Sequence, residues 1–326
     1  MKLMLDVEIK SPPGKITYAD KLFLIGSCFT EHIGRRLEEL KFPVLQNPNG
    51  ILFDPISVSK SINSYVDLKK YGKEDLFFLN ELWQSWNHHS FFSGTDILAV
   101  LANINRSQVA AHHYLKNATW MIITLGSAFS YQLNDNEQSV ANCHRAPGQL
   151  FNKNLLTAEA IALSLGETIQ KLTAFNPALK IIFTISPVRH IRDGVVENNR
   201  SKARLIEAVH QLVETYDHTF YFPAYELVID VLRDYRFYDV DLVHPNYAAT
   251  EIVFDRFEKS FVDGQTRNLR DEIRKIVNAF KHKPFHPDTV SHQLFMQNSL
   301  RSVMELKEKM PHIDFSREMT YFAGKS

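Results

Sequence analysis

The feature that most constrains the fold is a set of short, strand-like runs that alternate with segments of helical periodicity. Between the runs, apolar residues recur at the 3.6-residue spacing that is typical of amphipathic helices. Strands that alternate with helices favour a parallel sheet flanked by helices. The sequence therefore predicts an α/β fold. The strand-like runs lie at 21–26, 43–46, 118–126, 180–190 and 219–226.

The chain divides into a long α/β region and a charged helical tail. Its 326 residues, 44% of them hydrophobic, suffice for a substantial core. We expect the α/β domain to span residues 1–263, with an insertion at about 55–116 that exceeds what a simple crossover needs. Within it, the aromatic segment 75–94 is predicted to form a hairpin. Residues 264–326 are predicted to be a C-terminal helical appendage rather than a second core.

Composition narrows the classes of partner. Lysine plus arginine equals aspartate plus glutamate, at 37 each, so the net charge does not favour nucleic acid or an anionic membrane. The only two cysteines, Cys28 and Cys143, are too few for a disulfide framework or a set of thiolate metal ligands. The sequence shows no signal-peptide stretch and no run of roughly 20 apolar residues. It predicts a cytoplasmic protein without a membrane span that acts on a small molecule.

Residues that directly follow the strand-like runs are the strongest candidates for a site. In open α/β sheets, ligands bind outside the carboxyl ends of the strands, where such residues converge. Here they are Ser27, Gly50, Ser127, the segment 186–190 and the late segment 239–246, "DVDLVHPN".

The late segment is the most informative, because Asp241 and His244 are three residues apart. A carboxylate so placed can accept the imidazole Nδ1 proton and leave Nε2 as a base. A neutral imidazole can then activate a serine hydroxyl, which is otherwise a weak nucleophile. We expect Ser27, at the first strand-to-helix junction, to be that serine. Activity should then fall as the pH drops and His244 becomes protonated.

An oxyanion site is the remaining requirement of this chemistry. The backbone N–H of Ser27, at the positive end of the following helix, can serve an oxyanion. Gly50 is expected to supply a second N–H without a side chain that would block the substrate.

The ordered blocks of the sequence resemble those of a known family. The blocks are "GSCF", "NPNGILFDP", "TLGSAFSY", "NCHRAP", "SPVRH" and "DLVHPN", over roughly residues 20 to 260. In this order they look like the GSCFA family, a bacterial branch of the SGNH or GDSL-like hydrolases. The resemblance implies a flavodoxin-like α/β/α fold and ester hydrolase or acyl-transfer activity, and it calls for no cofactor.

Carried over by position, the resemblance gives Ser27 the role of nucleophile, His244 that of base and Asp241 that of its orienting partner. Gly50 takes the place of the second-block glycine. The chain departs from the wider superfamily after the third strand, where an asparagine is replaced by "LGSAFS". Ser127, or else Asn142 or His144 of "NCHR", is expected to supply the missing oxyanion donor.

Simpler structural explanations exist for the same residues. Ser27 can be an ordinary helix N-cap, and Asp241 and His244 can be a turn former and a helix cap. Cys28 is expected to be a small core residue on the apolar stripe of its helix. Neighbours on a helix do not share a face, so Cys28 cannot replace Ser27 as a nucleophile.

Histidines and arginines elsewhere allow further interpretations. The adjacent histidines at 87–90 and 112–114 invite a metal interpretation. Neighbours on a strand point to opposite faces, and no acidic partner lies at helical spacing, so no metal site is expected. His89 is a candidate for the pocket lining, because related proteins carry a histidine-bearing aromatic segment here. Arg145 and Arg189 can bind a substrate carboxylate or phosphate, or they can form salt bridges. The aromatic residues from Phe77 to Phe92 can pack as a core or lid, or stack on a sugar.

The sequence thus predicts a serine hydrolase that removes an acetyl or short acyl group from a carbohydrate or small metabolite. A protein that only binds an acylated glycan or glycolipid is the alternative from another class. Acyl transfer to an acceptor other than water would use the same residues. The sequence predicts no oligomeric state.

Overall fold

A five-stranded parallel sheet forms the centre of the computed structural model, which describes residues 5–324. The strand order β10-β9-β5-β1-β2 places the strands, counted along the chain, in the flavodoxin-like order 2-1-3-4-5. The predicted α/β class with a parallel sheet is therefore confirmed. The strands are β1 (Leu22–Gly26), β2 (Val44–Gln46), β5 (Trp120–Leu125), β9 (Lys180–Ile185) and β10 (Thr219–Phe222).

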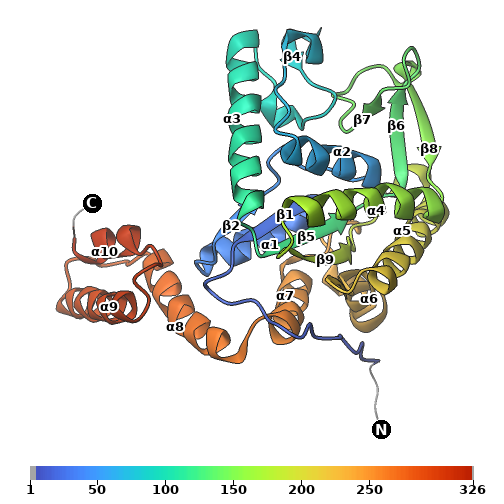
Figure 1. Cartoon of the computed structure of the whole chain (residues 1–326). Helices are drawn as coiled ribbons and strands as arrows, with labels where there is room; N and C mark the ends of the chain where they lie inside the picture. Colours follow the sequence, from blue (N-terminus) through green and yellow to red (C-terminus); the bar gives the residue numbers. More distant parts are fainter. Residues whose placement is uncertain (1–4, 325–326) are drawn as a thin grey trace.

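Helices cover both faces of this sheet, as Figure 1 shows. Successive side chains of β1 point to opposite faces. Leu22 and Leu24 therefore join one hydrophobic cluster, and Phe23 and Ile25 join the other. The first cluster includes residues of α1 (Cys28–Glu39) and α7 (Tyr247–Phe261). The second includes residues of α2 (Pro55–Val66), α3 (Ile97–Lys116), α4 (Ala158–Phe175) and α5 (Val195–Thr215).

Two small antiparallel units, together with part of α3, lie beyond the sheet, toward the top of Figure 1. One is the hairpin β3 (Phe77–Leu79) and β4 (Leu82–Gln84), as predicted for the aromatic segment. The other joins β6 (Phe129–Leu133) to β7 (Ser139–Val140) and β8 (Phe151–Leu155). Strand β8 was not predicted, because "FNKNL" has only two hydrophobic residues.

Two of the sheet strands end earlier than predicted. The run 180–190 leaves the sheet after Ile185, and the run 219–226 leaves it before Pro223. The segment 224–232 that follows is a short helix, α6 (Ala224–Glu226), continued by a π-helix. The remaining short helices are Lys73–Asp75, Ser90–Phe92, Gly148–Leu150, Ile191–Asp193 and Tyr235–Phe237, and the π-helix is Leu227–Leu232.

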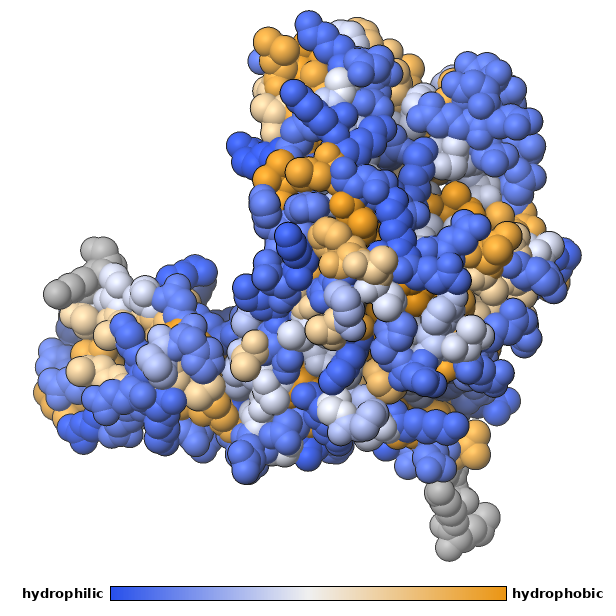
Figure 2. Space-filling view, viewed as in Figure 1, coloured by the Kyte–Doolittle hydropathy of each residue, from blue (hydrophilic) through white to orange (hydrophobic). Residues whose placement is uncertain are grey.

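The C-terminal helices form an arm that stands out from the body (Figure 1). They are α8 (Gly264–Lys281), α9 (Val290–Lys309) and α10 (Ser316–Phe322). Their buried hydrophobic residues belong to the same cluster as Leu22 and Leu24. Figure 2 shows a largely hydrophilic face with scattered hydrophobic groups. None of the helices within residues 5–324 is long and apolar enough to cross a membrane.

Candidate active site

Ser27 lies at the point where the connections of the sheet diverge. It directly follows β1, and Gly126 directly follows the neighbouring strand β5, with Gly26 paired to Thr124 in register. From β1 the chain continues to β2 on one side, and from β5 it continues toward β9 on the other. Ligands of open α/β sheets bind at such switch points.

The Ser27 hydroxyl has no structural task in this fold. Ser27 is the N-cap residue of α1, yet its side chain makes no cap hydrogen bond. It is fully buried, and its Oγ has no hydrogen-bond partner within residues 5–324. By contrast, the hydroxyl of Thr157 caps α4 by accepting the Ala160 N–H. Because the Ser27 side chain makes no cap hydrogen bond, the simple capping interpretation is wrong. Leaving a buried hydroxyl without a partner costs about 1–3 kcal/mol.

Cys28, the next residue, is held as an ordinary thiol. Burial, followed by the negative charge of Glu31, raises the pKa of Cys28. A thiol with a raised pKa is a poor source of the thiolate nucleophile. The structure therefore separates the two candidates, with the unpaired oxygen on Ser27 and a protonated thiol on Cys28.

Asp241 and His244 form the predicted pair. Asp241 Oδ2 lies 2.6 Å from His244 Nδ1, while Oδ1 accepts the backbone N–H groups of Val243 at 2.9 Å and His244 at 3.0 Å. These hydrogen bonds, that from the His244 backbone foremost, lower the pKa of Asp241 to about 2. The carboxylate thus stays ionised and fixes the imidazole with Nε2 directed away from it.

Arg189 holds the loop that carries this pair. Its backbone N–H donates to Val243 O at 3.2 Å, and its guanidinium donates to Leu242 O at 3.2 Å. The guanidinium also lies over the Tyr238 ring, 4.1 Å from the centroid. These contacts position the Asp241–His244 loop and use part of the Arg189 donors. The expected role of Arg189 as a binder of substrate carboxylate or phosphate stays a prediction.

Ser27 and His244 are not joined by a hydrogen bond, since Ser27 Oγ is unpaired. The side chains of Asp241 and His244 are 48% and 44% exposed, whereas Ser27 is fully buried. The predicted nucleophile and base therefore lie in different surroundings, one in the protein interior and one on a surface loop.

Both backbone donors expected for an oxyanion are occupied. Ser27 N–H donates to Thr124 O at 3.1 Å, which extends the ladder between β1 and β5. Gly50 N–H donates to Asn47 O at 2.7 Å and closes a tight turn. Gly50 has a φ of +79°, and an added Cβ would lie 2.2 Å from His89 Cβ. A glycine is needed for this turn and close approach. In this structure the Gly50 N–H is bonded within the turn, and the oxyanion role expected for it stays a prediction.

His190 is the last residue of the candidate segment 186–190, and no role of its own was predicted for it from the sequence. Its Nε2 is buried without a hydrogen-bond partner within the described chain, and its ring meets Phe53 edge-on. Burial, followed by the charge of Lys202, lowers the pKa of His190 to about 4, so the ring stays neutral. Its position after β9, in "SPVRH", was the available signal.

Lys202, on α5, lies beneath this part of the sheet edge. Its Nζ donates to Gly126 O at 2.6 Å and to Ser186 O at 2.7 Å, which ties together the segments that follow β5 and β9. Burial lowers the pKa of Lys202 to about 7. Nothing in the helical pattern of 198–216 distinguishes this lysine, so sequence reasoning missed it.

A cavity of about 390 Å³ is lined by His190, Ser127 and Asn142. Ser127 and Asn142 are candidates to replace the asparagine that the wider superfamily has after the third strand. The Ser127 hydroxyl accepts the N–H of Phe129, which holds it in a turn. Asn142 accepts the His144 N–H through Oδ1 at 2.9 Å, while its Nδ2 is not among the donors found in residues 5–324. The Ser127 hydroxyl also lies 3.4 Å from Ser201 Oγ, where either hydroxyl can be the donor, so both candidates keep a donor.

Two other candidates lie apart from this cavity. His89 lines a second cavity of about 620 Å³ together with Asn47, Gly50 and Glu31. Arg145 is exposed. Neither His89 nor Arg145 lines the cavity that Ser127 and Asn142 line.

The adjacent histidines are used in packing. His88 is fully buried with Nδ1 2.9 Å from Ser85 Oγ, and His89 accepts the N–H of Phe91. No group of three or more His, Cys, Asp and Glu side chains that could hold a metal ion occurs within residues 5–324.

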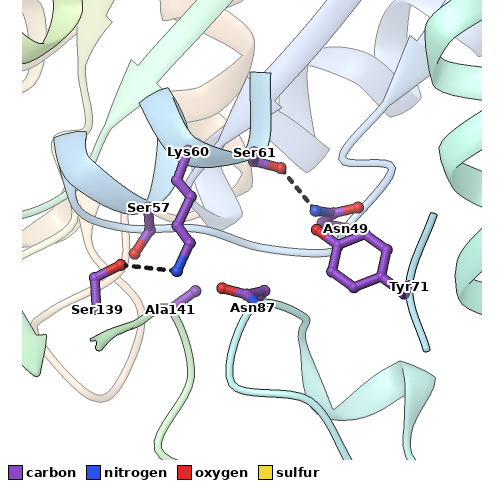
Figure 3. A pocket seen from close by; sticks show the side chains of 8 residues that line it. All are labelled: Asn49, Ser57, Lys60, Ser61, Tyr71, Asn87, Ser139 and Ala141. Atoms are coloured by element: carbon purple, nitrogen blue, oxygen red, sulfur yellow. Dashed lines mark hydrogen bonds between the residues drawn. The ribbon is translucent and has the colours of Figure 1, made fainter. Parts of the chain in front are cut away.

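Residues around a small polar cavity, shown in Figure 3, hold the turn that contains Gly50. Asn49 Nδ2 donates to Ser61 Oγ at 2.8 Å, and Lys60 Nζ donates to Ser139 Oγ at 3.3 Å. Its volume of about 10 Å³ is that of a single water molecule. This cavity is too small for a substrate.

Family models place the chain among known sequences. The model of the GSCFA family matches residues 21–257, and that of the GSCFA domain protein, C-terminal domain, matches residues 273–325. The chain belongs to the GSCFA family. The resemblance of its sequence blocks to this family is thereby confirmed. A search of curated proteins found no match for this GSCFA chain.

Solved structures give a weaker likeness. A carbohydrate esterase family 3 structure from Talaromyces cellulolyticus is 10% identical, with 78% of this chain and 99% of that chain covered and a TM-score of 0.37. An acetyl xylan esterase from Butyrivibrio proteoclasticus is 11% identical, with 75% and 65% covered and the same TM-score. At these values the likeness does not bear on the chemistry of this GSCFA protein.

Proposed function

We propose that this protein is a serine ester hydrolase that forms an acyl-enzyme at Ser27. The observation that carries the proposal is the Ser27 hydroxyl, which is fully buried and unpaired at a helix N-terminus. A group kept in this costly state at a switch point of the sheet is suited to react with a bound ligand.

His244 acts as the general base in this proposal. With Nδ1 bound to Asp241, its Nε2 takes the proton of the Ser27 hydroxyl as the oxygen attacks the ester carbonyl. The same proton then passes to the departing alkoxide, and water releases the acyl group. Because no hydrogen bond joins His244 to Ser27 in this structure, the proposed mechanism requires the loop to move toward Ser27 when substrate binds.

The 390 Å³ cavity beside His190 supports a small polar ester as substrate, although Ser27 and His244 are not among the residues that line it. It lies within the size range of small-molecule sites. Its lining combines the aromatic rings of Phe53, Phe129 and Tyr131 with the polar groups of Asn142 and Lys153. Rings beside polar groups suit an acetylated or short-acylated carbohydrate or metabolite.

Ester hydrolysis by the full chain tests this function. The protein should hydrolyse nitrophenyl acetate faster than longer-chain nitrophenyl esters and should release acetate from acetylated sugars, with the Ser27→Ala variant as the background. Failure to hydrolyse any of these esters, or full activity in Ser27→Ala, would contradict the proposal. Transfer of the acyl group to an added sugar or alcohol would identify an acyltransferase that uses the same residues.

Binding without catalysis is the second candidate. It is favoured by the occupied N–H groups of Ser27 and Gly50 and by the missing hydrogen bond between Ser27 and His244. A binding protein would bind an acetylated glycan in calorimetry, release no acetate and keep its affinity in Ser27→Ala. A hydrolase would release acetate.

A further inference from the structure

The segments after β1, β5 and β9 pack closely around a narrow space beside Ser27. A Cβ added to Gly126 would lie 3.3 Å from Ser27 Cβ, 3.4 Å from His190 Nε2 and 3.2 Å from Phe53 Cδ1. Ser27 and His190 therefore flank the same narrow space from different segments of the chain. Only a glycine fits at position 126 without displacing one of these neighbours.

His190 presents a polar atom to this space that nothing else uses. Its Nε2 is buried without a partner in the described chain, although burying an unpaired polar group costs about 1–3 kcal/mol. The backbone of His190 is fixed through its N–H, which donates to Asn198 Oδ1 at 2.9 Å, and its ring packs against Phe53. The imidazole is thus held in place rather than free to turn away.

The backbone donors beside Ser27 cannot fill the same role in this structure. The N–H groups of Ser27 and Gly50 are donated to carbonyl oxygens of the chain. A site that forms a tetrahedral intermediate still needs donors aimed at the developing negative charge.

We propose that His190 is a catalytic residue whose Nε2–H donates a hydrogen bond to the oxyanion formed on attack by Ser27. This inference rests on the proposed ester hydrolysis. As Ser27 Oγ bonds to the carbonyl carbon, the C=O π pair moves to the carbonyl oxygen, and the hydroxyl proton goes to His244. The proton on His190 Nε2 stays in place. When the carbonyl re-forms, the alkoxide leaves with the proton from His244.

The surroundings of His190 suit a neutral donor better than a base. The groups that act on it are Lys202, His244, Asp193 and Lys153, and burial is the largest influence. Burial and Lys202 lower the pKa of His190 to about 4, so the ring carries one proton at neutral pH. A neutral imidazole can polarise a carbonyl as a hydrogen-bond donor. No carboxylate within the described chain is hydrogen-bonded to His190, whereas Asp241 orients His244.

Two substitutions at position 190 separate the roles that this histidine can play. In His190→Leu the donor is lost, and kcat for nitrophenyl acetate should fall on the order of 100-fold to 1,000-fold, with KM changed far less. In His190→Asn an amide N–H replaces the imidazole donor, and part of kcat should return. If His190 were the general base instead, His190→Asn would recover no activity, since asparagine cannot accept the Ser27 proton.

The wild-type protein and Ser27→Ala, measured beside these variants, distinguish the two levels of the proposal. If the wild type neither turns over the ester nor reacts with a fluorophosphonate, the proposed function fails and the role of His190 fails with it. If the wild type is active and His190→Leu is equally fast, only the role of His190 is overturned. Equal loss in His190→Asn and His190→Leu, with both variants folded by circular dichroism, also overturns it. If His190→Leu does not fold, the recovery or loss of kcat in His190→Asn decides.

Discussion

The two parts of the candidate site differ in how the fold holds them. The sheet edge around Ser27 and Gly126 is buried, and Lys202 ties it together through two carbonyl groups. The Asp241–His244 loop is nearly half exposed, and Arg189 holds it through backbone carbonyls and an aromatic ring. The buried part carries Ser27, the proposed nucleophile, and the exposed loop carries His244, the proposed base. In the proposed mechanism such a division lets substrate enter before the two groups meet.

The largest expected effect separates function from stability at Ser27. Ser27→Ala should lower ester turnover by about 10⁴-fold or more. Because the variant removes a buried, unpaired hydroxyl, its free energy of unfolding should be unchanged or raised by up to about 1 kcal/mol. Urea denaturation and turnover measure the two effects.

Thr157→Ala is the matched control, since the Thr157 hydroxyl does cap its helix. It should lower the free energy of unfolding by about 0.5–2 kcal/mol and leave turnover unchanged. A similar loss of stability in Ser27→Ala would show that Ser27 is a structural residue after all.

Filling the space beside Ser27 tests the buried part of the comparison. Gly126→Ala should lower kcat by about 100-fold, because its Cβ displaces the reacting groups by a fraction of an ångström. Gly148→Ala is the control, because no atom lies within 4 Å of its added Cβ. Equal turnover in the two variants would mean that the space at Gly126 is not used.

Loosening the exposed loop should have a smaller effect. Arg189→Met removes a hydrogen bond to Leu242 O and a contact with the Tyr238 ring, each worth about 1 kcal/mol. We expect kcat to fall about tenfold, with little change in the thermal unfolding midpoint. Arg200→Met, which loses only an ion pair with Glu197 on its own helix, should behave as wild type. Unchanged kcat in Arg189→Met would show that the loop is positioned by other contacts.

For Lys202 the expected effect is on stability rather than turnover, and it is a pH dependence. Burial lowers its pKa to about 7, whereas a lysine in the unfolded chain titrates near 10.4. Between these values the unfolded chain holds a proton that the folded chain has lost, so stability rises with pH.

This contribution has a slope of up to about 1.4 kcal/mol per pH unit and should be absent from Lys202→Met. Denaturant titrations at pH 7 to 10 measure the difference between the two proteins. Parallel curves for wild type and variant would contradict the lowered pKa.

The fold and part of the site could be predicted from the sequence because they depend on local pattern. The alternation of strand-like and helical segments predicted the parallel sheet, and the spacing of Asp241 and His244 predicted their hydrogen bond. The position of Ser27 after β1 was predicted in the same way.

Features that depend on tertiary contacts could not be predicted. Lys202 reads as one more charged residue in a helix, and only folding brings it under Gly126. The contacts of Arg189 and Gly50 could not be predicted either, because the carbonyl groups that each one binds lie at positions set by folded loops. His190 gained its place beside Ser27 through the same assembly of strand ends.

The central claim is that Ser27 is the nucleophile, and covalent labelling tests it most directly. The full chain would be treated with a fluorophosphonate and digested, and the modified peptide would be identified by mass spectrometry. If Ser27 is the nucleophile, one adduct forms on Ser27 and is absent from Ser27→Ala. An adduct on another residue, or none at all in a folded protein, would contradict it.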